Sequence, residues 1–151
     1  MTRSNGPAAT RRAALSGLAL IAVPRLARAT PEERDAALAQ FLAGRAPQRG
    51  RVTIDAPALV ENGNSAPVTI RVDSPMTAQS HVTRIALFNE KNPQPQVAEF
   101  RLSPRNGRAE VSTRMRLATT QFITAAAEFN DGTVAVDSFE VIVTIAACTE
   151  E

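Results

Sequence analysis

Apolar and polar residues alternate over most of the chain after residue 51, and this period of two predicts β-strands. The clearest case is Val68, Ile70 and Val72, which are separated by polar side chains. Alternation of this kind is typical of a strand with one buried face. We expect strands near residues 52–60, 68–72, 82–88, 97–102, 109–117, 122–129 and 134–145, the last as one strand or a pair.

Turn-forming residues separate these segments. Asn62-Gly63 and Asp131-Gly132 are strong turn signals, because Asn, Asp and Gly accept a positive φ. Pro57 lacks a backbone donor, which predicts an edge strand or a bent strand over 52–60. About seven short strands indicate an all-β, antiparallel β-sandwich over residues 51–145. Its core is expected to contain five phenylalanines: Phe88, Phe100, Phe122, Phe129 and Phe139.

A short helix is expected before the strands, within a segment of helix and linker over residues 30–50. Thr30 is a good capping residue, and Pro31 followed by two glutamates suits the first helical turn. Apolar residues at 36, 37, 41 and 42 give the helix one apolar stripe, and Gly44 and Pro47 end it. The helix either lies against the main domain or hangs loosely from it.

Residues 1–29 are expected to form an export signal. Arg11 and Arg12 precede a mildly apolar run over 13–23, and small residues near position 29 suit a cleavage site. The run is about half the ~20 residues that span a bilayer, so we expect no membrane anchor. Paired arginines are typical of twin-arginine signals, which export folded proteins. An ordinary secretory signal or a basic tail is the alternative.

The net charge does not favour a nucleic-acid partner. The formal charge is +2, but five of the seventeen basic residues lie in the first 28 positions. The other twelve, with fifteen acidic residues, give the remainder a net charge of −3. The chain has no Trp and no Tyr, so the stacking that nucleic-acid binding uses is thinly supplied.

The residues that usually carry catalysis are nearly absent. The chain has one histidine, His81, and one cysteine, Cys148. They are far apart in the sequence and no further ligands stand at useful spacing, so we expect no metal site, no cofactor and no catalytic residue. His81 precedes a predicted strand and is interpreted as a residue of the sandwich rim. The chain is therefore not expected to be an enzyme by itself.

Cys148 lies in a short terminal arm over residues 146–151. An unpaired cysteine is unusual in an exported protein, because oxidising compartments favour disulfides. In a continued strand, Cys148 would share a face with Ile142, Thr144 and Ala146, which makes full burial less favourable. The residues alone leave two readings open: an incidental thiol, or a thiol presented to a partner.

Several motifs in order resemble the SoxY family of bacterial sulfur-oxidation proteins. The resemblance covers the whole chain. The motifs that carry it are Glu61-Asn62-Gly63-Asn64, Pro67-Val68-Thr69-Ile70, Ser74-Pro75-Met76-Thr77, Ser112-Thr113-Arg114-Met115-Arg116-Leu117-Ala118 with Gln121, Asp131-Gly132, and Val143-Thr144-Ile145 before Cys148.

This resemblance implies an immunoglobulin-like β-sandwich in the periplasm that pairs with a SoxZ-type sandwich subunit. It implies that Cys148 carries thiosulfate-derived sulfur covalently. It also implies transient partners that act on this cargo: a c-type cytochrome that attaches thiosulfate, a hydrolase that removes sulfate, and a sulfane dehydrogenase.

The arm departs from the family pattern, which ends Gly-Gly-Cys-Gly-Gly. Here Ala146 and Ala147 precede the cysteine, and Thr149 and two glutamates follow it. Alanine narrows the backbone freedom that glycine gives. Glu150, Glu151 and the terminal carboxylate would each raise the pKa of the thiol by about 0.4 unit at ~7 Å in water, before salt screening.

Three functions are therefore open. The first is a periplasmic sulfur carrier that uses Cys148. The second is a SoxY-like paralogue that binds a SoxZ-type partner as an interaction or regulatory module but does not cycle sulfur. The third is an unrelated exported β-sandwich, which the motifs make the least favoured.

Overall fold

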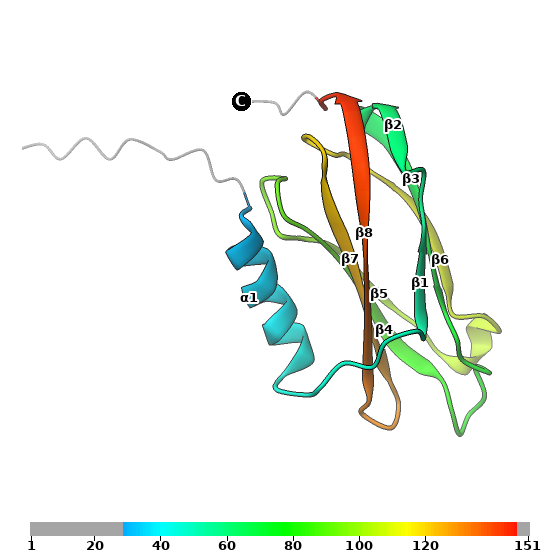
Figure 1. Cartoon of the computed structure of the whole chain (residues 1–151). Helices are drawn as coiled ribbons and strands as arrows, with labels where there is room; N and C mark the ends of the chain where they lie inside the picture. Colours follow the sequence, from blue (N-terminus) through cyan, green and yellow to red (C-terminus); the bar gives the residue numbers. More distant parts are fainter. Residues whose placement is uncertain (1–28, 148–151) are drawn as a thin grey trace, which may run out of the picture.

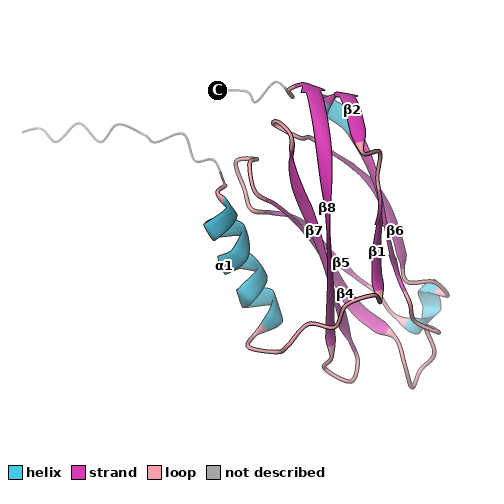
Figure 2. Ribbon diagram, in the orientation of Figure 1, coloured by secondary structure: helices cyan, strands magenta, loops and turns pink. Residues whose placement is uncertain are grey.

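Two β-sheets packed face to face, with one helix on the outside of the larger sheet, make up the protein (Figures 1 and 2). The computed structural model describes residues 29–147, so the expected export signal lies outside the described residues. No helix within 29–147 is long and apolar enough to cross a membrane. The expected all-β sandwich with a short N-terminal helix is confirmed.

Helix α1 (Pro31–Leu42) begins as its sequence predicts. The Thr30 hydroxyl accepts the amide of Glu33, and the Glu33 carboxylate accepts the amide of Thr30. The helix ends at Ala43, whose φ is +49°. It lies against the sheet: Phe41 packs edge-on to Phe88, with ring centroids 6.1 Å apart.

The smaller sheet has the order β1-β3-β6 and is antiparallel throughout. Its strands are β1 (Val52–Asp55), β3 (Ala66–Val72) and β6 (Glu110–Met115). Its outer face is polar, and the polar side chains that point away from the core pair across neighbouring strands. Arg71 contacts Asp55 and Glu110 in this way.

The larger sheet has the order β2-β8-β7-β4-β5. Its strands are β2 (Leu59–Asn62), β4 (Val82–Asn89), β5 (Gln96–Arg101), β7 (Gln121–Phe129) and β8 (Val134–Ile145). Neighbours pair antiparallel except β2, which runs parallel to the last residues of β8. β8 is one continuous strand, which decides between the two expectations for 134–145.

The segment 52–60 is two strands in different sheets and not one bent strand. Pro57 lies between β1 and β2 and has no amide to continue the β1 ladder. The chain then joins the other sheet, where the Ile142 amide donates to the Ala58 carbonyl. The predicted turn at 61–64 is the end of β2 and a 3₁₀ helix, Gly63–Ser65, in which Asn62 Oδ1 accepts the Asn64 amide.

Four of the five phenylalanines expected in the core are buried or partly buried. Phe88 is fully buried, but beneath α1 and not between the sheets. Phe129 and Phe139 pack in the core between the sheets. Phe122 contradicts the expectation: it is 40% exposed, because it lies on the outer face at the start of β7 and is not among the residues that pack beneath α1.

A charged cluster beside α1 joins the helix to the sheet. Glu128 on β7 forms ion pairs with Arg45, which follows α1, and with Arg84 on β4, at 2.7 and 2.6 Å. Burial alone would raise the pKa of Glu128, but hydrogen bonds from Arg45 and Arg84 hold that pKa below its usual 4.5.

Glu128→Gln should destabilise the protein by about 2 kcal/mol at neutral pH, because it breaks charge-assisted hydrogen bonds. The pKa of Glu128 is lower in the folded state than in the unfolded state. Its contribution to the unfolding free energy is therefore complete above pH ~4.5 and is lost as the pH falls through the folded-state pKa. The variant should therefore lose less stability on acidification, as measured by urea unfolding. The control is Glu110→Gln, which removes the exposed ion pair with Arg71 and should lower the unfolding free energy by less than about 1 kcal/mol. An equal loss in the two variants would contradict this account.

Candidate functional site: the base of the C-terminal arm

Strand β8 carries the chain to the end of the sandwich where the arm begins. Two segments from elsewhere in the sequence hold the chain just before Cys148. The Ala147 amide donates to the Leu117 carbonyl at 3.2 Å, and the Leu117 amide donates to the Gly63 carbonyl at 2.8 Å. Ala147 is 7% exposed. We call Gly63, Leu117 and Ala147 the arm base.

Gly63 is required at the arm base by lack of space. A Cβ at this position would lie well inside contact distance of the Leu117 carbonyl oxygen and 2.9 Å from the Ala147 nitrogen. The Asn62-Gly63 signal suggested that glycine is needed for a positive φ. Gly63 does not have a positive φ, so the reason for glycine here is its lack of a side chain. Any side chain here would push the three segments apart.

Asn92, in the β4–β5 loop, organises the loops around the arm base. Its Oδ1 accepts the amide of Ala118 and the side-chain amide of Gln121, and its Nδ2 donates to the Arg116 carbonyl at 2.7 Å. Its own carbonyl accepts the Ala29 amide. The segment 116–121, which includes Leu117, is therefore fixed to the β4–β5 loop and to the start of the described chain.

Buried polar groups complete this network. Gln121 is 1% exposed, and its Oε1 accepts the Lys91 amide at 3.0 Å. The carboxylate of Glu90, also buried, accepts the Phe122 amide. The Thr120 hydroxyl accepts the Val143 amide on β8. Because an unpaired buried polar group is costly, this network holds the arm base in one arrangement.

The structure describes two of the predicted site residues, and the others lie outside residues 29–147. Ala146 is exposed and Ala147 is buried. Cys148 and Thr149, as well as Arg11 and Arg12 of the expected signal, lie outside the described residues. Gly63, Leu117 and Gln121 belong to the sequence motifs, but no role at the arm base was predicted for them. Asn92 was missed, because no local sequence signal identifies a loop asparagine that connects distant segments.

The described residues offer no alternative centre of metal chemistry. No group of three or more His, Cys, Asp or Glu side chains within 29–147 could hold a metal ion. His81 lies beside the β7–β8 turn, away from the arm base: its amide donates to Asn130 Oδ1, and its Nδ1 is 3.1 Å from the Thr77 carbonyl oxygen. A cavity of about 250 Å³ lies between α1 and β8 and is lined by two arginines: Arg34, which is beside Asp35 and Glu90, and Arg49.

Gly63→Ala should separate the segments at the arm base. We expect a loss of about 1–3 kcal/mol in unfolding free energy from overpacking and faster hydrogen exchange at the Ala147 amide. Gly132→Ala is the control: its Cβ meets nothing within 4 Å, but its φ of +83° is strained for alanine. It should lower global stability without selectively exposing the Ala147 amide; selective exposure in both variants would contradict the role of Gly63.

The sequence model of the family described as "Sulfur oxidation protein SoxY" matches residues 38–148. This range includes the sandwich, the arm base and Cys148. No curated protein sequence matches the chain.

Among solved structures, the sulfur carrier protein SoxY from Chlorobium limicola f thiosulfatophilum is similar at 33% identity and a TM-score of 0.63, over 76% of this chain and 98% of that one. The superoxide reductase (neelaredoxin) from Ignicoccus hospitalis is 18% identical with a TM-score of 0.55, over 76% and 94% of the two chains, which shows the fold alone. By the family match and the SoxY structure together, this chain belongs to the SoxY family of sulfur oxidation proteins.

Proposed function

We propose that the chain is a sulfur carrier that binds thiosulfate-derived sulfur covalently at Cys148 and presents it to partner enzymes. The observation that carries this proposal is the family match over residues 38–148, which includes Cys148, the one cysteine of the sequence. The arm base holds the chain at the end of the sandwich one residue before this cysteine, which suits a thiol that partner enzymes must reach. Family membership and the similarity to a protein titled a sulfur carrier support the same role.

Loading is an oxidation and needs a partner. The Cys148 thiol and thiosulfate lose two electrons and one proton as a sulfur–sulfur bond forms: Cys–SH + S₂O₃²⁻ gives Cys–S–S–SO₃⁻ + H⁺ + 2e⁻. A c-type cytochrome is the proposed electron acceptor. A hydrolase then releases sulfate, with water supplying the oxygen, and leaves Cys–S–SH + SO₄²⁻ + H⁺. A sulfane dehydrogenase is proposed to oxidise the sulfur that remains.

We propose the periplasm as the location of this chemistry. The support is the sequence of residues 1–29, in which Arg11 and Arg12 precede a short apolar run. Export through the twin-arginine route would deliver the sandwich already folded. The carrier would then encounter its partners with the arm base formed.

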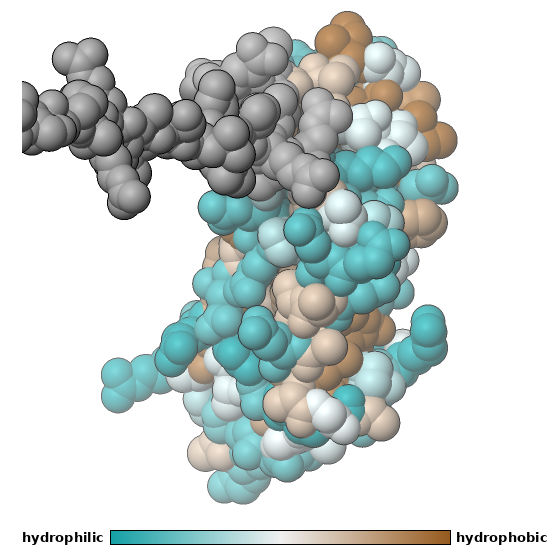
Figure 3. All heavy atoms as spheres, turned by 90° about the vertical axis from the view of Figure 1, so that its left-hand side faces the viewer, coloured by the Kyte–Doolittle hydropathy of each residue, from teal (hydrophilic) through white to brown (hydrophobic). Residues whose placement is uncertain are grey.

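A SoxZ-type subunit is the proposed permanent partner, and an exposed apolar patch supports an interface beside the arm. Three large apolar residues are exposed on the outer face of the larger sheet at the arm end, which α1 leaves uncovered: Leu59, Phe122 and Ile142. Leu59 and Ile142 are opposite each other across β2 and β8. Figure 3 shows hydrophobic spheres gathered near this end. Such a patch on a soluble domain is typical of a protein interface.

A paralogue that binds a partner without cycling sulfur is the second candidate, favoured by one observation. Ala147 is 7% exposed, so its methyl group packs against the sandwich at a position where the family has glycine. Loading separates the two candidates.

The exported chain, incubated with thiosulfate and the oxidising cytochrome, should gain one –S–SO₃⁻ group at Cys148. Intact-mass and peptide mass spectrometry measure this gain. Cys148→Ser should remain unmodified under the same conditions, because a hydroxyl does not form the sulfur–sulfur bond. An unmodified wild-type chain under turnover conditions would reject the carrier function and leave the paralogue.

Ile142→Asp should weaken binding of the SoxZ-type subunit at least about tenfold, because it buries a charge in the proposed interface. Isothermal titration calorimetry measures the affinity. Val97→Asp is the matched control, since Val97 is a similarly exposed apolar residue on β5, at the other edge of the sheet. Equal losses in the two variants, or no loss in either, would place the partner elsewhere.

A further inference from the structure

The middle of β8 is a free edge of the larger sheet. On one side, β8 pairs with β7 along residues 134–141. On the other side it has two short neighbours: a bridge between Gln48 and Ala135, and β2, which pairs with β8 from Ile142 onward. In Figure 1 the chain after α1 crosses the lower part of β8, and β2 lies beside its upper end. Between them, no described segment pairs with residues 137–141 on this side.

The backbone groups of Ser138 and Glu140 point toward this free edge. The neighbouring residues fix the direction, because the amides of Val136 and Ile142 both donate to carbonyls on the side away from β7. Amides alternate in direction along a strand, so those of residues 138 and 140 point the same way. Within residues 29–147, neither residue makes a backbone hydrogen bond on this side. Unpaired groups of this kind are a template for pairing with another chain.

The free edge is short, and its length limits what can pair with it. Residues 137–141 span about 17 Å of strand. A chain beside them meets the Gln48 segment at one end and β2 at the other, since both already occupy the neighbouring strand position. The β8 strand of a second copy has 12 residues and would run into both. The edge therefore suits a short extended segment.

The cavity of about 250 Å³ lies directly beside this edge. Arg34 and Leu38 line it from α1, Arg49 from the segment after α1, and Val136 and Ser138 from β8. Side chains of directly opposite residues in a sheet lie on the same face. A strand added beside Ser138 would therefore direct a side chain to the face on which the cavity lies.

Two arginines give this cavity donors for an acidic side chain. The Arg34 side chain is 17% exposed, and its Nε–H is buried without a hydrogen-bond acceptor. Asp35 Oδ1 is 2.7 Å from this nitrogen but not in the direction of its N–H bond, and the Glu90 carboxylate is 3.7 Å from Nη1. Arg49 forms no ion pair within residues 29–147. A carboxylate between the two guanidinium groups would accept charge-assisted hydrogen bonds.

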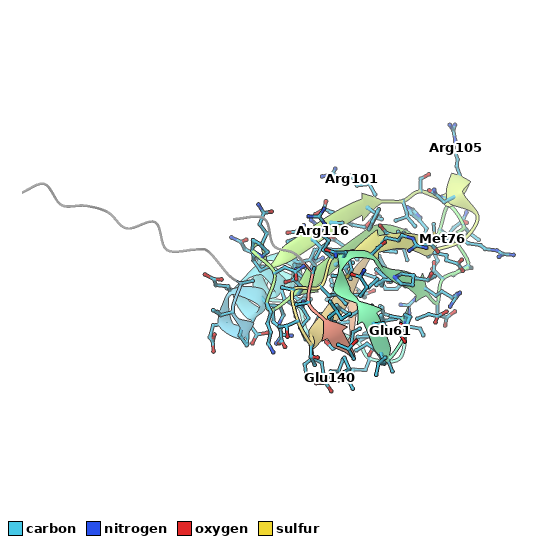
Figure 4. All side chains as sticks on the ribbon, turned by 90° about the horizontal axis from the view of Figure 1, so that it is seen from above. Glu61, Met76, Arg101, Arg105, Arg116 and Glu140 are labelled. Atoms are coloured by element: carbon cyan, nitrogen blue, oxygen red, sulfur yellow. The ribbon has the colours of Figure 1, made fainter. Side chains whose placement is uncertain are left out.

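Two acidic residues of β8 limit where an incoming acid is favourable. Asp137 borders the cavity, but strand alternation turns its side chain to the face opposite Ser138. Glu140 is exposed and on the same face as Ser138. In Figure 4 it lies on the opposite side of the molecule from Arg101, which is on β5, the other edge of the larger sheet. An acid beside Glu140 would be repelled, whereas a cationic side chain there would pair with it.

We propose that the free edge of β8 and the adjoining cavity are a docking site for a short extended segment of a partner protein. The segment adds as a strand beside residues 137–141. Its acidic residue enters the cavity between Arg34 and Arg49, and a basic residue two positions away pairs with Glu140. The site does not involve Cys148, so it adds to the carrier function a separate means of recognising partners.

Two capped peptides with opposite residue order test strand addition on the exported chain. Val-Thr-Glu-Val-Lys-Thr places the acid before the base, as a parallel added strand requires, and Thr-Lys-Val-Glu-Thr-Val suits an antiparallel strand. One of them should shift the NMR signals of the Ser138 and Glu140 amides and slow their hydrogen exchange. The order that binds gives the direction of the added strand. If neither peptide affects these amides at millimolar concentration, the proposal is wrong.

A double-mutant cycle tests the acidic residue. Glutamine in place of the peptide's glutamate should weaken binding about fivefold, because charge-assisted hydrogen bonds are lost. Arg49→Gln should weaken the glutamate peptide by a similar factor and leave the glutamine peptide unchanged. Arg105→Gln is the control and should change neither affinity, since Arg105 is in the β5–β6 loop, far from Glu140 in Figure 4. Equal sensitivity of both peptides to Arg49→Gln overturns the proposal.

Ser138→Pro tests the backbone contact, because proline has no amide to offer at the edge. It should weaken peptide binding at least about tenfold. The matched control is Ser138→Ala, which loses the same hydroxyl, 2.9 Å from Thr124 Oγ1, but keeps the amide and should still bind. Unchanged binding by Ser138→Pro contradicts strand addition. If this variant does not fold, a peptide N-methylated at its central residues replaces it and should not bind.

The chain without peptide distinguishes a partner segment from a second copy. Hydrogen exchange at the Ser138 and Glu140 amides should not depend on protein concentration. Exchange that slows as the concentration rises would show a second copy at this edge and would overturn the proposal. Loading of Cys148 is measured separately, so failure of the carrier function leaves these outcomes unchanged.

Discussion

Burial of the middle of the larger sheet on both faces is the constraint on which the rest of the structure depends. Ile85 and Leu87 on β4 face the smaller sheet, and Ala86 and Phe88 face α1. Gln121, at the arm end of this sheet, is 1% exposed and therefore needs hydrogen-bond partners within the protein. At the arm end Asn92 and Gln121 meet this requirement, and in doing so they fix the loop that holds Ala147.

The sequence pattern predicted local elements well and connections between sheets poorly. The alternation of Val68, Ile70 and Val72 identified β3, and the capping residues of α1 fixed its first turn. The two sheets to which β1 and β2 belong could not be read from the sequence, because the period of two is the same in either sheet. The exposure of Phe122 was likewise hidden, since it depends on how far α1 extends over the sheet.

The candidate site shows the same division. Cys148 was identifiable as the only thiol, and family motifs pointed to the residues around it. Gly63 was recognised as part of a turn signal. The structure shows that glycine is needed there because the backbones of Leu117 and Ala147, 54 and 84 positions further along the chain, approach it closely. A contact between segments so distant in sequence leaves no periodic or local signal.

The parallel pairing of β2 with the end of β8 gives the arm a mechanical property. On the proposed function, the arm is pulled when the carrier separates from a partner enzyme that holds its cargo. Such a pull runs along β8, while the ladder bonds to β2 on one side and β7 on the other lie across the strand. The pull therefore acts on these hydrogen bonds in shear and loads them together, so that they do not break one after another. β8, which ends three positions before Cys148, is thus held by a neighbouring strand on each side.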